Sequence, residues 1–288
     1  MAPSIARQDT AALGGRWSVL ERQKRDHVEL ERLLVRLSES EGREQDRVLL
    51  AVYRLVFPHA FAEEAVLWPV MRRSLHDGEE LTLEVEREHQ EVNELVLRLD
   101  ARRLDGEERR RVLDRLAQVL RDDVRDEEDS LFPRLQAVVT VGQLRLLGVL
   151  WEVVRRAAPT RAHPVVARRP PGNVLAALPL TVVDRARDLV EGSALRIPAV
   201  AAMPLERLGR ALAGVALAIE HVPGLTAGED ESTRSAGRHP VAAAAGKLLA
   251  VAAVSVSAAA IIHGLESHRG SAKGRTSSAA AGLVTPLR

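Results

Sequence analysis

The sequence predicts an all-α protein that begins with an antiparallel up-down-up-down four-helix bundle. Apolar residues recur at helical spacing from about residue 17 to residue 139. Three short polar stretches that end in Gly42, Gly78 and Gly106 divide this region. Glycine is a favoured helix stop, and short connections make neighbouring helices antiparallel. We therefore expect four long helices, over about 17–39, 44–74, 79–101 and 107–139.

The remaining sequence has a different character. Residues 157–173 contain four prolines and three arginines, which is typical of an extended linker. We expect the bundle to cover 17–139, a helix end and Pro/Arg-rich linker to cover 140–173, and an Ala-rich helical region of unknown role to cover 174–265. A disordered tail is expected over 266–288. All seven aromatic residues lie within the first 151 positions.

Charge and composition exclude several kinds of functional site. Residues 1–140 hold 23 Lys/Arg against 30 Asp/Glu, whereas residues 141–288 hold 18 against 10, so an acidic part precedes a basic part. The chain has no cysteine, which excludes disulfides, thiolate metal sites and cysteine nucleophiles. The N-terminal residues include no apolar stretch of signal-peptide length, so we expect a cytoplasmic protein.

One apolar run, residues 241–265, allows two interpretations. No residue from Leu248 to Ile262 is charged, but the run is rich in alanine and contains Lys247. A bilayer span needs about 20 mainly apolar residues, and a lysine within it is costly. We favour an Ala-rich helix packed on its neighbours. The alternative is a peripheral or C-terminal membrane association through this run.

Two thirteen-residue segments of the bundle are imperfect copies of each other. Residues 57–69 read FPHAFAEEAVLWP and residues 121–133 read RDDVRDEEDSLFP. Each copy has a potential metal ligand four residues before a glutamate, His59 before Glu63 and Asp123 before Glu127. Residues four apart share one face of a helix, so each pair projects into the same space. The prolines that end both copies predict a kink or local break.

Two further histidines, His27 and His89, lie on the other two helices at similar depths in the predicted bundle. Imidazole and carboxylate groups without sulfur suit iron, manganese or zinc. A carboxylate can bridge two ions, and Glu63 and Glu127 are the natural bridges of a binuclear centre. The candidate metal ligands are His27, His59, Glu63, His89, Asp123 and Glu127.

Other residues near these candidates have weaker support as metal ligands. Glu64 and Glu128 also repeat, but adjacent residues do not share a helix face, so we expect them to be exposed or to support the ligands from behind. A ferritin-like site would need Glu-x-x-His on two helices, and Glu86 with His89 is the one such pair in the bundle. Histidines without a carboxylate four residues on, such as His163, are expected to have no ligand role.

The combination resembles the hemerythrin family, specifically the bacterial hemerythrin-like HHE cation-binding domains. Their pattern is a histidine on the first helix, His-x3-Glu on the second, a histidine on the third and His-x3-Glu on the fourth. His27, His59 with Glu63, His89, and Glu127 match it. The resemblance covers roughly residues 20–139 and implies a non-haem di-iron bundle that binds dioxygen or a related diatomic molecule.

Asp123 departs from that pattern, because a histidine is expected at this position. The site would then hold three carboxylates and three imidazoles, and more anionic ligands favour an oxidised metal. We therefore hypothesise a site shifted from reversible oxygen carriage toward oxidation chemistry or simple metal holding. Loss of one iron is a second consequence of the same substitution.

The leading interpretation is an iron protein that senses, stores or scavenges dioxygen, nitric oxide or peroxide. The sequence shows no catalytic nucleophile or phosphate-binding loop, so enzyme status stays open. The alternative is a metal-poor helical interaction module whose basic C-terminal half binds a partner or an acidic membrane. Nucleic acid is not an expected partner, because the basic half offers no aromatic stacking platform.

Overall fold

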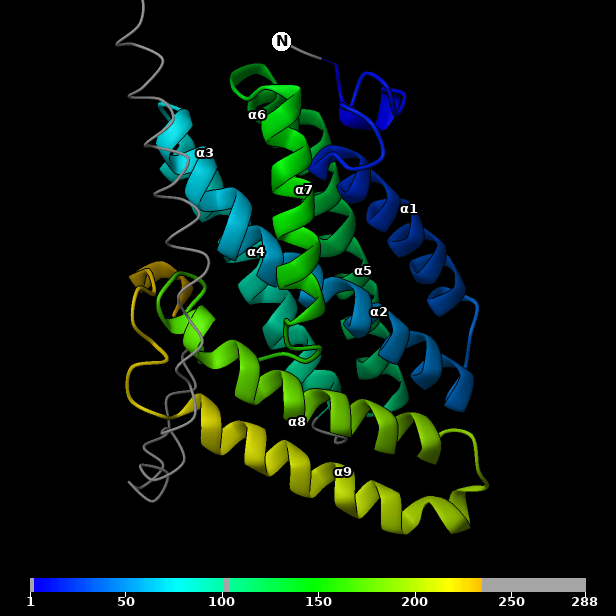
Figure 1. The fold of residues 1–288 in the computed structure, drawn as a ribbon. Helices are drawn as coiled ribbons and strands as arrows, with labels where there is room; N and C mark the ends of the chain where they lie inside the picture. Colours follow the sequence, from blue (N-terminus) through cyan, green and yellow to red (C-terminus); the bar gives the residue numbers. More distant parts are fainter. Residues whose placement is uncertain (1–2, 101–103, 235–288) are drawn as a thin grey trace, which may run out of the picture. The chain divides into compact units, whose positions relative to one another are not determined.

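A computed structural model describes residues 3–100 and 104–234, and these residues are helical with no β-strand (Figure 1). This confirms the all-α class. The apolar run at 241–265 and the tail at 266–288, for which we made separate predictions, lie outside the described residues. No helix in the part of the chain that the structure describes has both the length and the apolar character needed to cross a bilayer.

Four long helices form the bundle: α1 (Val19–Ser38), α2 (Gly42–Ala62), α4 (Gly78–Asp100) and α5 (Gly106–Asp126). Helix α1 packs against α2, and α4 against α5. Each predicted break is present, and its glycine is the first residue of the following helix. At Gly78 no other residue fits, because a Cβ atom would lie 2.4 Å from the backbone oxygen of Met71.

Side chains at the helix starts explain where several helices begin. The Ser18 hydroxyl accepts a hydrogen bond from the backbone N–H of Leu20 at the start of α1. The Asp105 carboxylate accepts one from Glu108 at the start of α5. Such caps satisfy backbone N–H groups that have no partner within the helix, and each contributes about 1 kcal/mol.

The second and fourth long helices are each followed by a wider turn. Helix α2 continues through the π-helical turn η2 (Glu63–Leu67) into α3 (Trp68–Ser74), and α5 continues through η3 (Glu127–Leu131) into α6 (Phe132–Val138). The next residue after each π turn donates its N–H to the carbonyl of the turn's first glutamate.

The repeated prolines explain these turns. Pro69 and Pro133 are the second residues of α3 and α6, and in a regular α-helix a proline ring would meet the carbonyl four residues earlier. A widened turn relieves that contact, so the predicted local break takes the form of a π turn without ending the helix. Pro58, by contrast, lies inside α2, and Phe57 before it is helical despite its unfavourable position before a proline.

The apolar core of the bundle is divided into two layers. One layer includes Leu34, Val52, Val96 and Leu116, toward one end of each long helix. The other includes the largest fully buried side chains, among them Trp68, Phe132 and Trp151. On every long helix, the candidate ligands lie between the residues of one layer and those of the other. A polar layer is therefore enclosed by apolar side chains on both sides.

The chain after the bundle forms three more helices. Helix α7 (Val141–Arg156) packs against α1 and α2, and its Trp151 is fully buried. Helices α8 (Gly172–Ala194) and α9 (Ala199–Glu220) pack against each other, with a small core of their own around Ala176 and Leu180 (Figure 1). Residues 158–171, hereafter the strap, connect α7 to α8 without regular helix.

Candidate metal centre

The structure brings all six candidate ligands together in the polar layer of the bundle. His27 comes from α1, His59 from α2 and His89 from α4. Glu63 and Glu127 are the first residues of the two π turns, and Asp123 lies on α5, one turn before Glu127. Four of them are almost fully buried, and the side chains of His59 and Asp123 are only 11% and 12% exposed. Four helices that are distant in sequence therefore direct imidazole and carboxylate groups into one space.

The first group of ligand atoms belongs to His27, His59, Glu63 and Glu127, and these atoms all lie within 4.8 Å of one another. His27 Nε2 is 3.2 Å from Glu127 Oε2. His59 Nε2 is 3.0 Å from Glu63 Oε1. Such a group could hold one metal ion with two nitrogen and two oxygen ligands.

The second group consists of His89, Asp123 and Glu127, again within 4.8 Å of one another. His89 Nε2 is 3.9 Å from Asp123 Oδ1 and 3.8 Å from Glu63 Oε2. Glu127 belongs to both groups, and the two oxygens of Glu63 face different histidines, His59 and His89. The two groups are therefore adjacent, with two glutamates between them.

Several of these atoms are buried without a hydrogen-bond partner among the described residues. They are His27 Nε2, Asp123 Oδ1 and both carboxylate oxygens of Glu63 and of Glu127. A buried carboxylate without a hydrogen bond or a cation is costly, since it loses its hydration and gains nothing in return. The short distances and the lack of hydrogen bonds suit atoms that converge on a cation. The residues present therefore fit a metal ion.

The pKa values show how the metal-free site compensates its charges. Burial, together with the charge of Glu127, raises the pKa of Asp123 well above its usual range. Burial also opposes protonation of His27 and His89, but contacts with neighbouring carboxylates outweigh it and raise their pKa values to about 9 and about 10. Protons on the histidines thus balance the carboxylates, and a bound cation would displace them.

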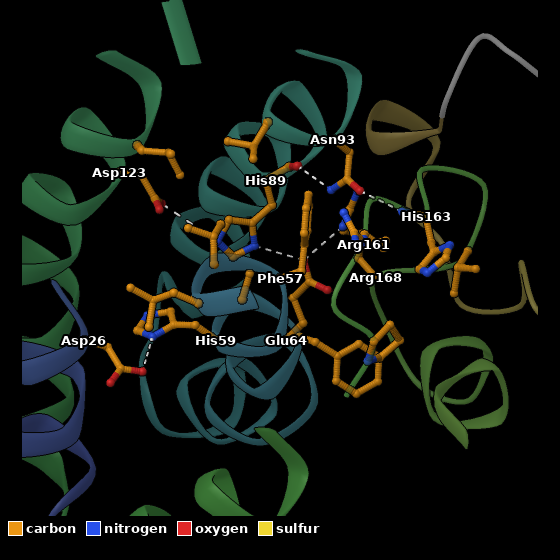
Figure 2. Close-up of a pocket in the computed structure, with 18 of the residues that line it drawn as sticks. Asp26, Phe57, His59, Glu64, His89, Asn93, Asp123, Arg161, His163 and Arg168 are labelled. Atoms are coloured by element: carbon orange, nitrogen blue, oxygen red, sulfur yellow. Dashed lines mark hydrogen bonds and ion pairs between the residues drawn. The ribbon is translucent and has the colours of Figure 1, made fainter. Parts of the chain in front are cut away.

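Each of the three histidines has a second carboxylate on its other ring nitrogen. His27 Nδ1 lies 2.9 Å from Glu128 Oε1, and His89 Nδ1 lies 2.9 Å from Glu64 Oε1. His59 Nδ1 is 3.3 Å from Asp26 Oδ2, as Figure 2 shows. A carboxylate on Nδ1 holds the proton there and leaves Nε2 free to bind a metal.

These three acids are candidate site residues that the sequence placed poorly or gave no sign of. Glu64 is buried, so the expectation of an exposed residue is wrong for it, and it lies behind the candidate ligand His89, as the alternative expectation had it. Glu63 and Glu64 need not share a face, because Glu63 Oε2 faces Nε2 of the His89 ring whereas Glu64 Oε1 contacts its Nδ1. The repetition of both glutamates was the available signal. For Asp26 the sequence offers none.

A cavity of about 70 Å³ adjoins the candidate ligands. His59, His89 and Asp123 line it on one side, and Arg161, His163 and Arg168 of the strap line it on the other (Figure 2). His27 and residues of α8 also line it. A water molecule needs about 10–15 Å³ on the same measure, so the cavity accommodates only a molecule of a few atoms.

Residues outside the six have other partners. Glu86 is fully buried and pairs with Arg72 and Arg169, so it is not directed at the centre, and the ferritin-like pairing with His89 is not formed. His163 is buried between Asp184 and Glu220, at 2.9 Å from each.

A helical bundle whose buried layer offers histidines and carboxylates from four helices belongs to the class of metal-binding helical bundles. Residues 18–135, which span the bundle and end before α7, match the family model for the hemerythrin HHE cation binding domain, and this part of the chain belongs to that family. The chain is also 25% identical over 134 residues to an uncharacterised hemerythrin-like protein of Schizosaccharomyces pombe. That alignment covers 46% of this chain and 66% of the yeast protein. No solved structure matches the chain significantly.

Proposed function

We propose that the bundle is a non-haem di-iron protein that senses, stores or scavenges dioxygen, nitric oxide or peroxide. The observation that carries the proposal is the pair of adjacent ligand groups that share Glu127 and face the two oxygens of Glu63. Two carboxylates between two cation positions are what a binuclear centre requires. The family match to a cation-binding domain supports a metal, and the mixed nitrogen and oxygen ligands support iron.

The iron ions would supply redox chemistry and open coordination positions for a small ligand. The chain's own residues would prepare the site. Glu128, Glu64 and Asp26 hold protons on the Nδ1 atoms of the histidines, so that the Nε2 atoms face the metals. The apolar layers on both sides exclude water. The cavity of about 70 Å³ restricts access to molecules of a few atoms, which supports a diatomic molecule or peroxide as ligand.

Asp123 supports the finer proposal of oxidation chemistry or metal holding in place of reversible oxygen carriage. It adds a third carboxylate near His89, and a fuller negative charge stabilises the oxidised metal. The metal-poor interaction module loses support, because the family model describes a cation-binding domain and the candidate ligands converge. A cytoplasmic location stays a prediction for cell fractionation to test.

Iron quantitation after anaerobic loading tests the function directly. We expect two irons per chain and charge-transfer absorption in the oxidised form. The variant Glu127→Ala removes the residue that both groups share and should lower the iron content, whereas His76→Ala removes an exposed histidine and should leave it unchanged. One iron per chain would contradict the binuclear centre, and no iron would contradict the iron assignment.

A further inference from the structure

The strap is buried to an extent that its composition does not suggest. Thr160 is fully buried, and Arg161 and Arg168 are only 4% and 8% exposed. Arginine is seldom buried in proteins unless its charge is paired. The strap also lies beyond residue 135, where the match to the cation-binding family ends. Its buried arginines therefore need partners elsewhere in the fold.

Helix α8 holds the first half of the strap in place. The Thr160 N–H donates to Asp184 at 2.9 Å, and Arg161 pairs with Asp188 at 2.7 Å. His163 lies between Asp184 on α8 and Glu220 on α9. The strap is thus attached to the α8–α9 pair by charged and buried groups.

The backbone of Arg168 is fixed on both sides. Its N–H donates to the carboxylate of Glu229, and its carbonyl oxygen accepts a hydrogen bond from Asn173 Nδ2 at 2.9 Å. The preceding residue, Ala167, donates its N–H to the carbonyl of Leu225 at 2.9 Å. With the backbone held in this way, the direction of the Arg168 side chain is set by the chain after α7.

The guanidinium of Arg168 reaches the bundle beside His89. It donates through Nη2 to Gln90 Oε1 at 2.6 Å, and its Nη1 lies 3.5 Å from Glu64 Oε1. The same oxygen of Glu64 lies 2.9 Å from His89 Nδ1 (Figure 2). The side chains of all three residues in this series are at least nine-tenths buried. A cation, a carboxylate and a candidate ligand thus follow one another within a region that excludes water.

We propose that Arg168 is a positioning residue for the metal centre, acting on His89 through Glu64. The proposal rests on the function proposed above. The guanidinium of Arg168 attracts Glu64 Oε1 and so holds the carboxylate in place beside the His89 ring. Held there, Glu64 Oε1 accepts the Nδ1–H of His89 and leaves Nε2 facing the ligand group. At 3.5 Å the guanidinium acts mainly through its charge.

A second arginine beyond residue 135 repeats the arrangement at another histidine. Arg155 of α7 lies 3.6 Å from Asp26 Oδ2, the oxygen that faces His59 Nδ1 at 3.3 Å. The described residues show no arginine paired with Glu128, which supports His27. Two of the three histidine–carboxylate pairs are therefore backed by arginines that the family-matched residues do not contain. The α8–α9 pair acquires a role in this arrangement, because it holds the strap from which Arg168 projects.

The test compares Arg168→Met with Arg169→Met. Arg169 is the next residue of the strap and pairs with Glu79 and Glu86, away from Glu64, so its variant is a matched control for general damage to the strap. Proton–nitrogen NMR of the histidine rings is recorded without metal and again with zinc as a diamagnetic probe. We expect Arg168→Met to shift the Nδ1 resonance of His89 and to leave that of His27 unchanged.

Zinc affinity, measured by competition with a chelator, provides the second readout. Loss of a residue behind a ligand typically costs 10–100-fold in metal affinity, and we expect about 10-fold for Arg168→Met because it acts through Glu64. Arg168→Lys keeps the charge and should restore most of the affinity and the His89 resonance. If Arg168→Met does not fold, Arg168→Gln removes the charge while keeping a hydrogen bond to Gln90.

An unchanged His89 resonance in Arg168→Met or Arg168→Gln would overturn the positioning role, as would an equal shift in Arg169→Met. These results are distinguishable from failure of the proposed function. A protein that binds no iron but shows the His89 shift would lose the di-iron assignment and keep the Arg168 inference. A protein that binds two irons but shows no such shift would support the di-iron assignment and contradict the Arg168 inference.

Discussion

The buried ion pair of His163 predicts that stability depends on pH. Burial opposes protonation of this histidine, but its hydrogen bonds to Asp184 and Glu220 outweigh burial and raise its pKa from 6.5 to about 9. A group with a raised pKa stabilises the folded state fully below the unfolded pKa and loses that effect as the pH rises through the folded pKa. The stabilisation should therefore be complete below pH 6.5 and absent above about pH 9.

The size of the effect follows from the shift. One pKa unit corresponds to about 1.4 kcal/mol, so a shift from 6.5 to about 9 corresponds to about 3 kcal/mol of unfolding free energy. Because His163 is buried, solvent does not screen this interaction appreciably. The protonated histidine joins the strap to α8 and α9, so the loss should appear as weakened attachment of these segments.

Urea denaturation of the metal-free protein and of His163→Gln at several pH values from about 6 to about 9.5 measures this effect. The histidines of the metal centre also titrate, but they are common to both proteins, so the difference between the two unfolding free energies isolates His163. That difference should fall by about 3 kcal/mol from the lowest to the highest pH. A difference that does not change with pH would refute the reasoning.

Two further predictions concern the centre and the core. Glu128→Gln removes the negative charge beside His27 Nδ1 and should weaken metal affinity by about 10–100-fold in a chelator competition, with unchanged affinity as the contrary result. Trp151→Ala empties a fully buried position and should cost about 3–5 kcal/mol in urea denaturation, while Trp17→Ala at a 51% exposed position should cost less than about 0.5 kcal/mol. Equal losses for the two tryptophans would contradict the assignment of Trp151 to the core.

Much of the fold could be predicted from the sequence, because the relevant signals are local. Apolar spacing and the glycines at positions 42, 78 and 106 locate the long helices, and the spacing of His59 with Glu63 places two candidates on one helix face. The convergence of all six candidates follows once four such helices pack with short connections. Helical periodicity and the distance of each candidate from its helix end are enough to predict this convergence.

The parts that could not be predicted depend on contacts between distant residues. Arg168 and Glu64 are 104 positions apart, and a segment rich in proline and arginine has the composition of a solvated linker whether or not it is buried. Asp26 supports a histidine 33 positions away, and no local pattern indicates this. Glu64 was expected to be exposed because it is adjacent to Glu63, but His89 of α4 and Arg168 of the strap, both distant in sequence, contact it.

The π turns have a consequence for how the centre tolerates change in the chain. Each turn accommodates one residue more than an α-helix would use over the same length, and one residue corresponds to a rotation of about 100°. A single-residue deletion within η2 would therefore restore a regular α-helix and keep Trp68 in its present direction, whereas an insertion or deletion outside the turn would rotate it. The restored helix would bring the Pro69 ring against the carbonyl four residues earlier, so the deletion would strain the junction between the ligand-bearing segment and the aromatic layer beyond it.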